Sequence, residues 1–324
     1  MDQIACADIG GTNARFTLAR IHDGRVEDLD APLILPVRDF PDISSVWNAF
    51  IDHIGGRPPE RLSLALPAPV DQAEITMANN PWTIVPSQLA GMLGLRECLL
   101  LNDFEAIAWA VDAFEPWHLP RLCGPDSGLP DDGVIIVIGP GTGLGTAAIV
   151  RRDGTSLICG AEGGHIGFAP SSPFEDRLLS HLRSRYGRVS AERVISGPGI
   201  IPICEVLSAD RGLSFHAEED KDVWLRALSG EDAMAEEAMS LFCEVLGAFA
   251  GDIVLAWRAS AVVIAGGLGK RLTSVLPSSG FTERFAAKGR FESMLRQVPV
   301  RLVRHPEPGL YGAAAALAAR PERS

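Results

Sequence analysis

The sequence predicts an α/β protein of two duplicated domains. Residues 8–20 place a glycine turn between two strand-like runs, and residues 134–150 repeat that plan near the middle of the chain. An Asp-Gly pair, the preferred chemistry of a tight hairpin turn, follows both outgoing strands. The chain has 324 residues, 47% of them hydrophobic, which is enough to fill two cores.

The first glycine turn follows a short strand that ends near Asp8, and it consists of Gly10, Gly11, Thr12 and Asn13. Apolar and polar residues then alternate over 14–19, the period-two signal of a half-buried strand. Walker and dinucleotide loops run from a strand into a helix instead. The pattern therefore predicts a phosphate loop on a hairpin, with a carboxylate beside it.

The second glycine turn, residues 139–145, lies between strand-like runs at 134–138 and 146–150. Its glycines are Gly139, Gly141, Gly143 and Gly145, with Thr142 between them, and they match neither Walker nor dinucleotide spacing. Two such turns could hold one polyphosphate from opposite sides. The pairs Asp23-Gly24 and Asp153-Gly154 predict a third strand after each hairpin, and hence an internal repeat.

The composition excludes several classes of function. A formal net charge of −12 would repel nucleic acid and anionic lipid. No apolar run is expected to reach membrane-spanning length, and nothing at the N-terminus resembles a signal peptide. The six cysteines are dispersed and form no C-x-x-C pair, which favours reduced thiols and a cytoplasmic location. A domain junction is expected between residues 112 and 132, a segment rich in Pro and Gly.

A first candidate for catalysis is Asn102-Asp103, between a predicted strand at 98–101 and a predicted helix at 104–111. Ligands of open α/β sheets bind at the carboxyl ends of strands, where Asp103 could accept a proton from a substrate hydroxyl. The alternative is structural, because Asn and Asp are also preferred helix caps.

A second candidate is residues 162–165, which combine Glu162, two glycines and His165 after a predicted strand at 156–159. These groups could pair with the hydroxyls of a small polyol, or they could form an ordinary glycine turn. A metal site is disfavoured, because Cys159 has no partner at zinc-ligand spacing. Glu192 is a weaker candidate, since a first-turn Glu often only complements a helix dipole.

The third glycine element is Gly266-Gly267, after a buried-strand run at 261–265 and before a predicted helix. A nucleotide ring could lie flat against that backbone, or the glycines could serve close packing of a helix on a strand. Residues 309–320 are rich in alanine and predict a closing helix.

Together these motifs resemble bacterial glucokinase in their order and spacing, along nearly the whole chain. The matching segments are residues 8–15, 101–104, 141–145, 162–165, 190–199, 264–267, 281–291 and 308–310. The resemblance implies the actin-like ATPase fold (ribonuclease H-like), with duplicated mixed β-sheets and an interdomain cleft that closes over ATP and sugar. It implies a small domain at 1–113, joined by the closing helix at 308–324, and a large domain at 114–307.

The resemblance also implies an activity, the ATP-dependent phosphorylation of glucose on its 6-hydroxyl, with Asp103 as the catalytic base. The residues implied to hold the sugar are Asn79, Asn102, Asp103, Glu162, His165 and Glu192. Those implied to hold MgATP are Asp8, Gly10, Gly11, Thr12, Asn13, Gly139, Gly141, Thr142, Gly143, Gly266 and Gly267, with Asp8 on Mg²⁺ directly or through water. A cytoplasmic homodimer is expected.

Two departures from the resemblance concern the sugar pocket. This chain has Asn79-Asn80 before the tryptophan where relatives often have Asn-His, and Gly167 where an acidic residue is common. There are two alternatives, a kinase for another hexose and an inert sugar-binding regulator of the same fold. The presence of both Asp8 and Asp103 disfavours the inert regulator.

Overall fold

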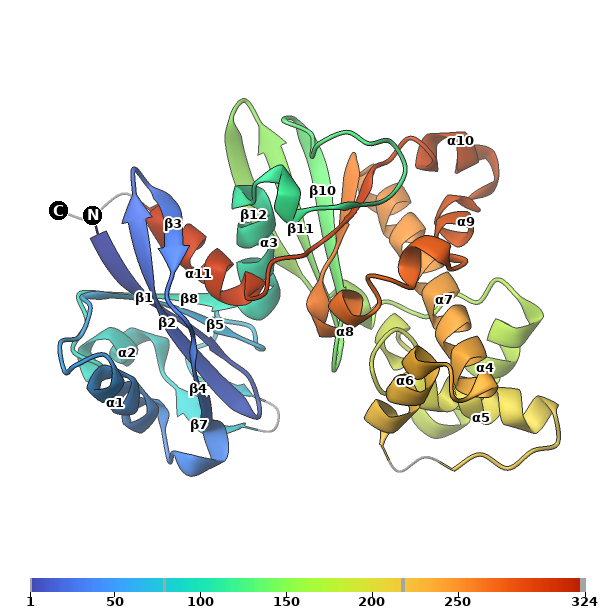
Figure 1. Cartoon of the computed structure of the whole chain (residues 1–324), viewed down its shortest axis with the longest axis horizontal. Helices are drawn as coiled ribbons and strands as arrows, with labels where there is room; N and C mark the ends of the chain where they lie inside the picture. The colour runs from blue at the N-terminus through green and yellow to red at the C-terminus, as the bar shows by residue number, and fades with distance from the viewer. Residues whose placement is uncertain (1, 78–79, 217–218, 321–324) are drawn as a thin grey trace. The chain divides into compact units, whose positions relative to one another are not determined.

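The computed structural model describes residues 2–77, 80–216 and 219–320 (Figure 1). The chain divides into two compact units. The first unit is Met1–Glu115 together with His305–Ser324, and the second unit is Pro116–Arg304.

The first unit contains a six-stranded mixed sheet in the order β3-β2-β1-β5-β8, with β4 paired to β2. The hairpin β1–β2 is antiparallel, whereas β1, β5 and β8 are parallel. The strands are β1 Asp2–Ile9, β2 Asn13–His22, β3 Arg25–Leu29, β4 Leu33–Pro36, β5 Arg61–Leu66 and β8 Glu97–Asn102. The strands β6 Ile75–Met77 and β7 Asn80–Ile84 form a separate two-stranded sheet.

Helices cover both faces of this sheet. Figure 1 shows α1 (Ile43–His53) and α2 (Pro86–Met92) on one face, and α3 (Asp103–Ala113) and α11 (Pro308–Ala318) on the other. Ala14 and Phe16 of β2 join the first core, and Ala19 and Ile21 join the second. The prediction of a half-buried strand was therefore wrong for β2, because a helix from the far end of the sequence covers its other face.

Helix α11 is anchored to this sheet by a buried arginine. The Arg61 guanidinium donates to the Leu317 carbonyl oxygen at 3.1 Å and to the Glu97 carboxylate at 2.9 Å, and it lies 3.2 Å from Asp2. Its charge is thus paired although the side chain is only 5% exposed, as a buried cation requires. The last helix of the chain consequently belongs to the first unit.

The second unit repeats the same plan. Its sheet has the order β12-β11-β10-β13-β14-β9, with an antiparallel β10–β11–β12 meander and parallel β10, β13 and β14. The strands are β9 Arg121–Cys123, β10 Gly133–Pro140, β11 Leu144–Arg152, β12 Thr155–Ala161, β13 Ala261–Ile264 and β14 Val300–Leu302. The predicted duplication is confirmed.

The Asp-Gly turns that begin the third strands are nearly identical in the two units. Asp23 and Gly24 have φ of 50° and 72°, and Asp153 and Gly154 have φ of 51° and 73°. Positive φ at both central residues is the type I′ geometry that matches the twist of a hairpin. Both predicted third strands, β3 and β12, follow these turns.

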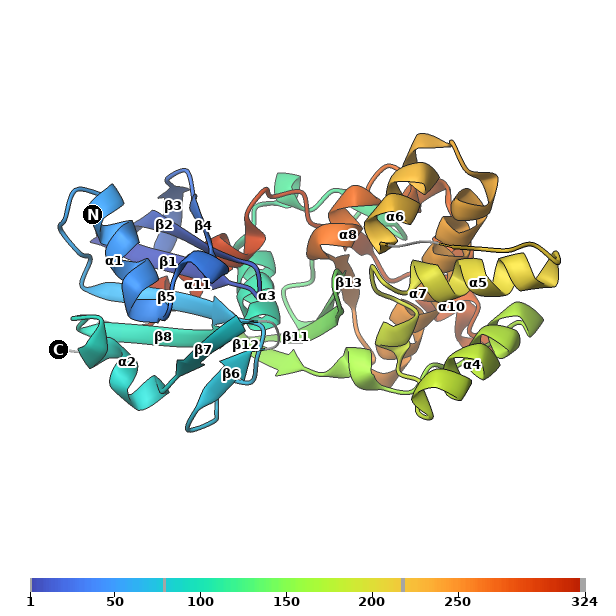
Figure 2. The same ribbon diagram turned by 90° about the horizontal axis from the view of Figure 1, so that it is seen from below.

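Helices α5, α6 and α9 of the second unit pack against its long central helix, α7 (Figure 2). The helices of this unit are α4 Pro173–Tyr186, α5 Ile200–Asp210, α6 Asp220–Ser229, α7 Ala233–Trp257, α8 Gly266–Arg271, α9 Phe281–Ala286 and α10 Glu292–Leu295. Short 3₁₀ turns cover Val37–Asp39, Pro116–His118, Gly163–His165, Ala191–Arg193, Leu276–Ser278 and Gly289–Phe291.

Helix α7 corrects one expectation from the sequence. Its 25 residues are long and apolar enough to cross a membrane by length and composition. However, 67% of its most apolar window is buried inside the protein, as in the core helix of a soluble domain. All six cysteines are free, and burial raises the pKa of the Cys98, Cys204 and Cys243 thiols to about 12.

Candidate active site

The site residues predicted in the first unit lie at one edge of its sheet. Strand register aligns Asp8 with Ala65, and Ala65 with Leu101, so Asn102 and Asp103 follow at the same carboxyl edge. Neighbouring strands are about 4.8 Å apart, which places Asp8 roughly 10 Å from the end of β8. This edge is where ligands of open α/β sheets bind.

The first glycine turn is held by backbone and side-chain hydrogen bonds. The Gly10 N–H donates to the Asn13 carbonyl at 2.9 Å, and the Val37 N–H donates to the Thr12 carbonyl at 2.9 Å. The buried Asn80 side chain donates to the Gly10 carbonyl at 3.3 Å. The turn leads directly into β2, so the prediction of a hairpin rather than a strand-to-helix loop is confirmed.

The Asp8 carboxylate lies in an environment that disfavours its charge. Burial raises its pKa and Glu307 adds to that shift, while Arg15, whose guanidinium is 3.4 Å away, opposes it. In the part of the chain that the structure describes, Arg15 Nε is buried without a hydrogen-bond partner. A cation beside Asp8 and an anion beside Arg15 would satisfy both groups, which fits a magnesium phosphate.

The described residues contain no group of three or more His, Cys, Asp or Glu that could enclose a metal ion. Mg²⁺ is commonly bound through one or two carboxylates together with substrate phosphates. A single carboxylate at Asp8 fits that mode, in which the ion arrives with the nucleotide.

Replacing Asp8 with Asn is expected to stabilise the protein while impairing catalysis. The raised pKa means that the folded state binds the proton more tightly, so the free energy of unfolding falls as pH rises from the unfolded pKa, about 3.9, through the folded one. The asparagine side chain of Asp8→Asn does not ionise, so the free energy of unfolding of the variant does not fall in this way as the pH rises. Urea unfolding in magnesium-free buffer should therefore show the variant to be more stable than wild type at pH 7.5, but not at pH 3.5. Turnover should fall about 100-fold. Lower stability of the variant at pH 7.5 would contradict the prediction.

Asn102 caps helix α3, as the structural alternative predicted. Its side-chain oxygen accepts from the Phe104 N–H at 2.9 Å, and the Asn102 N–H donates to the Glu105 carboxylate at 3.1 Å. These reciprocal bonds form a capping box. Asp103 is the first residue of α3, and its carboxylate accepts from the Phe104 N–H at 2.8 Å. The capping residue of α3 is therefore Asn102, and Asp103 follows it as the first helical residue.

In the second unit, the glycine turn at 139–145 lies against two other predicted site segments. The Glu192 carboxylate accepts from the Leu144 N–H at 2.9 Å, and a Cβ at Gly143 would lie 2.5 Å from the same oxygen. Gly266 has φ of 78°, and a Cβ there would lie 2.6 Å from the Pro140 carbonyl oxygen. Gly266 thus serves close packing, whereas Gly267 has open space beside it.

The position of Glu192 does not fit the alternative in which it only complements a helix dipole. It belongs to a three-residue 3₁₀ turn, Ala191–Arg193, which has almost no helix dipole to complement. Its carboxylate instead reaches a backbone amide 48 residues away in sequence.

Glu162 precedes, and His165 ends, a 3₁₀ turn that packs on β11. The Gly163 N–H donates to the Thr146 hydroxyl at 2.8 Å, and a Cβ at Gly164 would lie 2.1 Å from the Leu144 carbonyl oxygen. The close approach fixes the turn and leaves both side chains exposed, with 3.7 Å between the Glu162 carboxylate and His165 Nε2. Two polar groups are therefore presented to solvent by a rigid backbone.

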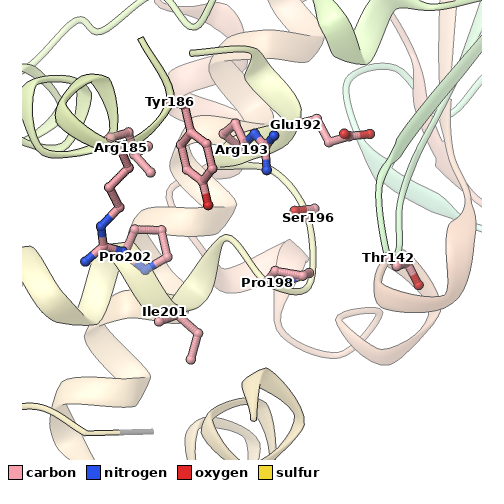
Figure 3. Close-up of a pocket in the computed structure, with 10 residues that line it drawn as sticks. Thr142, Arg185, Tyr186, Glu192, Arg193, Ser196, Pro198, Ile201 and Pro202 are labelled. Carbon is pink, nitrogen blue, oxygen red and sulfur yellow. The ribbon is translucent and has the colours of Figure 1, made fainter. Parts of the chain in front are cut away.

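A cavity of about 290 Å³ lies beside Glu192 and beside Thr142 of the second glycine turn (Figure 3). Figure 3 shows that Glu192 and Arg193 point to different sides of the backbone. The guanidinium carbon of Arg193 lies over the Tyr186 ring, 3.9 Å from the ring centroid. The residues that line the cavity are Thr142, Leu182, Arg185, Tyr186, Glu192, Arg193, Ser196, Pro198, Ile201 and Pro202.

The predicted residues form two groups, one in each unit. Asp8, Gly10–Asn13, Asn102 and Asp103 belong to the first unit, and the others belong to the second, except Asn79, which lies outside the described residues. Arg15, Asn80, Gly197 and Glu307 were not predicted as neighbours of the glycine turns. Asn80 was noted only as a departure from relatives, and Arg15 and Gly197 lie within segments that resemble glucokinase, whereas no local signal marks Glu307.

The family model named Glucokinase matches residues 5–320 of this chain. The chain belongs to the glucokinase family. The glucokinase of Zymomonas mobilis subsp. mobilis is 44% identical over 98% of both chains. The glucokinase of Stenotrophomonas maltophilia is 40% identical over 96% of this chain and 94% of its own. The predicted resemblance to bacterial glucokinase is confirmed.

Solved structures agree with the glucokinase assignment. The glucokinase from an Antarctic psychrotroph has a TM-score of 0.86 and 31% identity, and the match covers 98% of this chain and 99% of that one. A ROK family glucokinase from Streptomyces griseus, in complex with glucose and AMPPNP, has a TM-score of 0.61 and 19% identity, over 97% and 98% of the chains. That likeness shows the fold alone. The actin-like ATPase fold of this glucokinase-family chain is confirmed.

Proposed function

We propose that this chain transfers the γ-phosphoryl group of ATP to the 6-hydroxyl of glucose, giving glucose 6-phosphate and ADP. Membership of the glucokinase family along the whole chain supports an ATP-dependent hexose kinase. The observation that carries the proposal is the edge of the first sheet, where Asp8 beside a glycine turn and Asp103 at the end of β8 share one row of strand ends.

Asp103 is proposed as the base. Its carboxylate would accept the proton of the 6-hydroxyl as the oxygen attacks the γ-phosphorus, the new P–O bond forms and the bond to the β-γ bridging oxygen breaks. A carboxylate is a weak base for an alcohol, so it helps only as the O–H bond breaks. Such assistance contributes a factor of roughly 10² to 10⁴ in rate.

The two glycine turns are proposed to bind the phosphates through backbone N–H groups, with Gly266 and Gly267 beside the adenosine. Asp8 would orient Mg²⁺ directly or through a water. Mg²⁺ held there would supply positive charge to offset the charge that develops on the phosphate oxygens. Arg15, adjacent to Asp8, would place a second positive charge at the same position.

The sugar hydroxyls are proposed to contact Glu162, His165, Glu192 and Asn102, with Asn79 as a further contact. Glu162 and His165 present an acceptor and an imidazole from one rigid turn. Such paired groups suit a polyol and discriminate against analogues that lack a hydroxyl.

The test is MgATP-dependent release of ADP by the purified protein with glucose, mannose, fructose, N-acetylglucosamine or no sugar. We expect strong turnover with glucose and background turnover without sugar. Turnover with another sugar but not with glucose would show that the protein is a kinase for that sugar. If no sugar gave turnover while calorimetry still showed sugar binding, the result would contradict the proposal and favour an inert sugar-binding regulator.

Three further properties stay predictions from the family resemblance. They are a cytoplasmic location where the product feeds glycolysis, a homodimer, and closure of the domains over bound sugar. Light scattering coupled to size exclusion would test the dimer, and small-angle X-ray scattering with and without glucose would test closure.

A further inference from the structure

Residues 192–198, here called the bracing segment, contact the second glycine turn at two points. At one end, the Glu192 carboxylate accepts from the Leu144 N–H at 2.9 Å. At the other end, the Gly197 N–H donates to the Gly141 carbonyl oxygen at 2.7 Å. The turn itself is closed by a bond of 2.8 Å from the Gly141 N–H to the Gly143 carbonyl. Both halves of the turn therefore take their position from the bracing segment.

The bracing segment is held in turn by helix α6. The Trp224 indole N–H donates to the Gly197 carbonyl oxygen at 2.9 Å, and the Trp224 side chain is 1% exposed. The Ile200 N–H also approaches this oxygen, at the longer distance of 3.4 Å. Phe242 of α7 packs edge-on against Trp224 with 5.0 Å between ring centroids. A buried carbonyl requires such a donor, and the packed indole supplies it in a fixed position.

Gly197 is confined between α6 and the turn. A Cβ at this position would lie 2.8 Å from the Asp220 carboxylate and 3.3 Å from the Gly141 carbonyl oxygen. A shift of α6 would therefore move the Gly197 backbone, and the Gly197 backbone would move the glycine turn, with no side chain between them. This arrangement links a core tryptophan to the glycine turn through one residue.

We infer that Trp224 is a positioning residue for the glycine turn at 139–145, acting through Gly197. The catalytic part of this inference rests on the proposed function, in which that turn binds the phosphates of ATP. Loss of the indole N–H would leave the Gly197 carbonyl with only the longer bond from the Ile200 N–H, and would loosen the turn. Small displacements of groups that position substrate are costly to catalysis.

The test compares two tryptophans that make the same kind of bond. Trp224→Phe removes the indole N–H and keeps an aromatic ring in the core. Trp47→Phe is the matched control, because Trp47 is 3% exposed and its indole donates to the Leu93 carbonyl at 3.2 Å in the first unit. Both variants lose one buried hydrogen bond, but only the first contacts the bracing segment.

Hydrogen exchange is the readout that does not depend on activity. We expect the Leu144 and Gly197 amides to exchange about tenfold faster in Trp224→Phe than in wild type. Both amides become exposed to solvent when the bracing segment separates from the glycine turn. In Trp47→Phe they should exchange at the wild-type rate. Unchanged exchange of these amides in Trp224→Phe would overturn the inference, whatever the activity.

Steady-state kinetics test the consequence for catalysis. Trp224→Phe should raise KM for ATP about three- to tenfold, whereas Trp47→Phe should leave it unchanged. Equal changes in both variants would show a general loss of stability and overturn the catalytic part. If the wild-type protein does not phosphorylate glucose, the proposed function fails, and the ATP dissociation constant from calorimetry takes the place of KM.

Gly197→Ala acts on the same contact without changing the aromatic core. The Asp220 carboxylate can swing away from the added methyl group, but the Gly141 carbonyl must shift by a few tenths of an ångström. We expect a rise in KM for ATP in this variant too. Its failure to change ATP affinity, together with folded protein by circular dichroism, would contradict the role of Gly197 in the link.

Discussion

Asp103→Asn is expected to lower the turnover of glucose phosphorylation about 10²- to 10⁴-fold, with KM for glucose nearly unchanged. The amide keeps the shape of the carboxylate and retains an oxygen that can accept the Phe104 N–H. Helix α3 keeps its cap, because the capping box is made by Asn102 and Glu105. The variant therefore removes the proposed base and preserves the cap of α3, and kcat measured with saturating glucose and MgATP reports the loss.

A matched control for this variant is Asp176→Asn. Asp176 lies in the first turn of α4 and is exposed, so the substitution makes the same chemical change at another helix start. It should leave kcat unchanged. If Asp103→Asn also kept wild-type turnover, Asp103 would be a helix-start residue without a role as base.

Gly312→Ala is expected to destabilise the first unit by about 3 kcal/mol. Gly312 lies where α11 crosses α3, and a Cβ there would be 1.6 Å from the Ala106 carbonyl oxygen and 2.8 Å from the Ala110 nitrogen. Both obstacles are backbone atoms, so the helices must separate and part of the core must open. The free energy of unfolding from urea titration measures the loss.

Gly91→Ala is the corresponding control in an open position. Gly91 lies in α2, and an added Cβ would meet no atom within 4 Å. Because alanine is the better helix former, this variant should gain about 0.5–1 kcal/mol of stability. Similar stability of Gly312→Ala and wild type would show that α11 and α3 do not need this close approach.

The sequence alone determined the local parts of this protein. Both glycine turns and both Asp-Gly hairpins follow from backbone preferences of adjacent residues, and each was predicted correctly. The helix predicted at 104–111 is also present, although α3 begins one residue earlier, at Asp103. The duplication followed from these hairpins, because the same order of turns appears twice. These features depend on contacts only a few residues apart, which a single sequence records directly.

The long-range contacts around these turns and helices were visible only in the tertiary structure. It placed α11 on the second face of β2, Glu307 near Asp8, and Glu192 and Gly197 against the second glycine turn. Each of these contacts joins segments separated by tens to hundreds of residues, and local propensity carries no information about such pairs. The pKa of Asp8 and the bracing of the turn depend on burial and on distant partners, so they become visible only when the chain is folded.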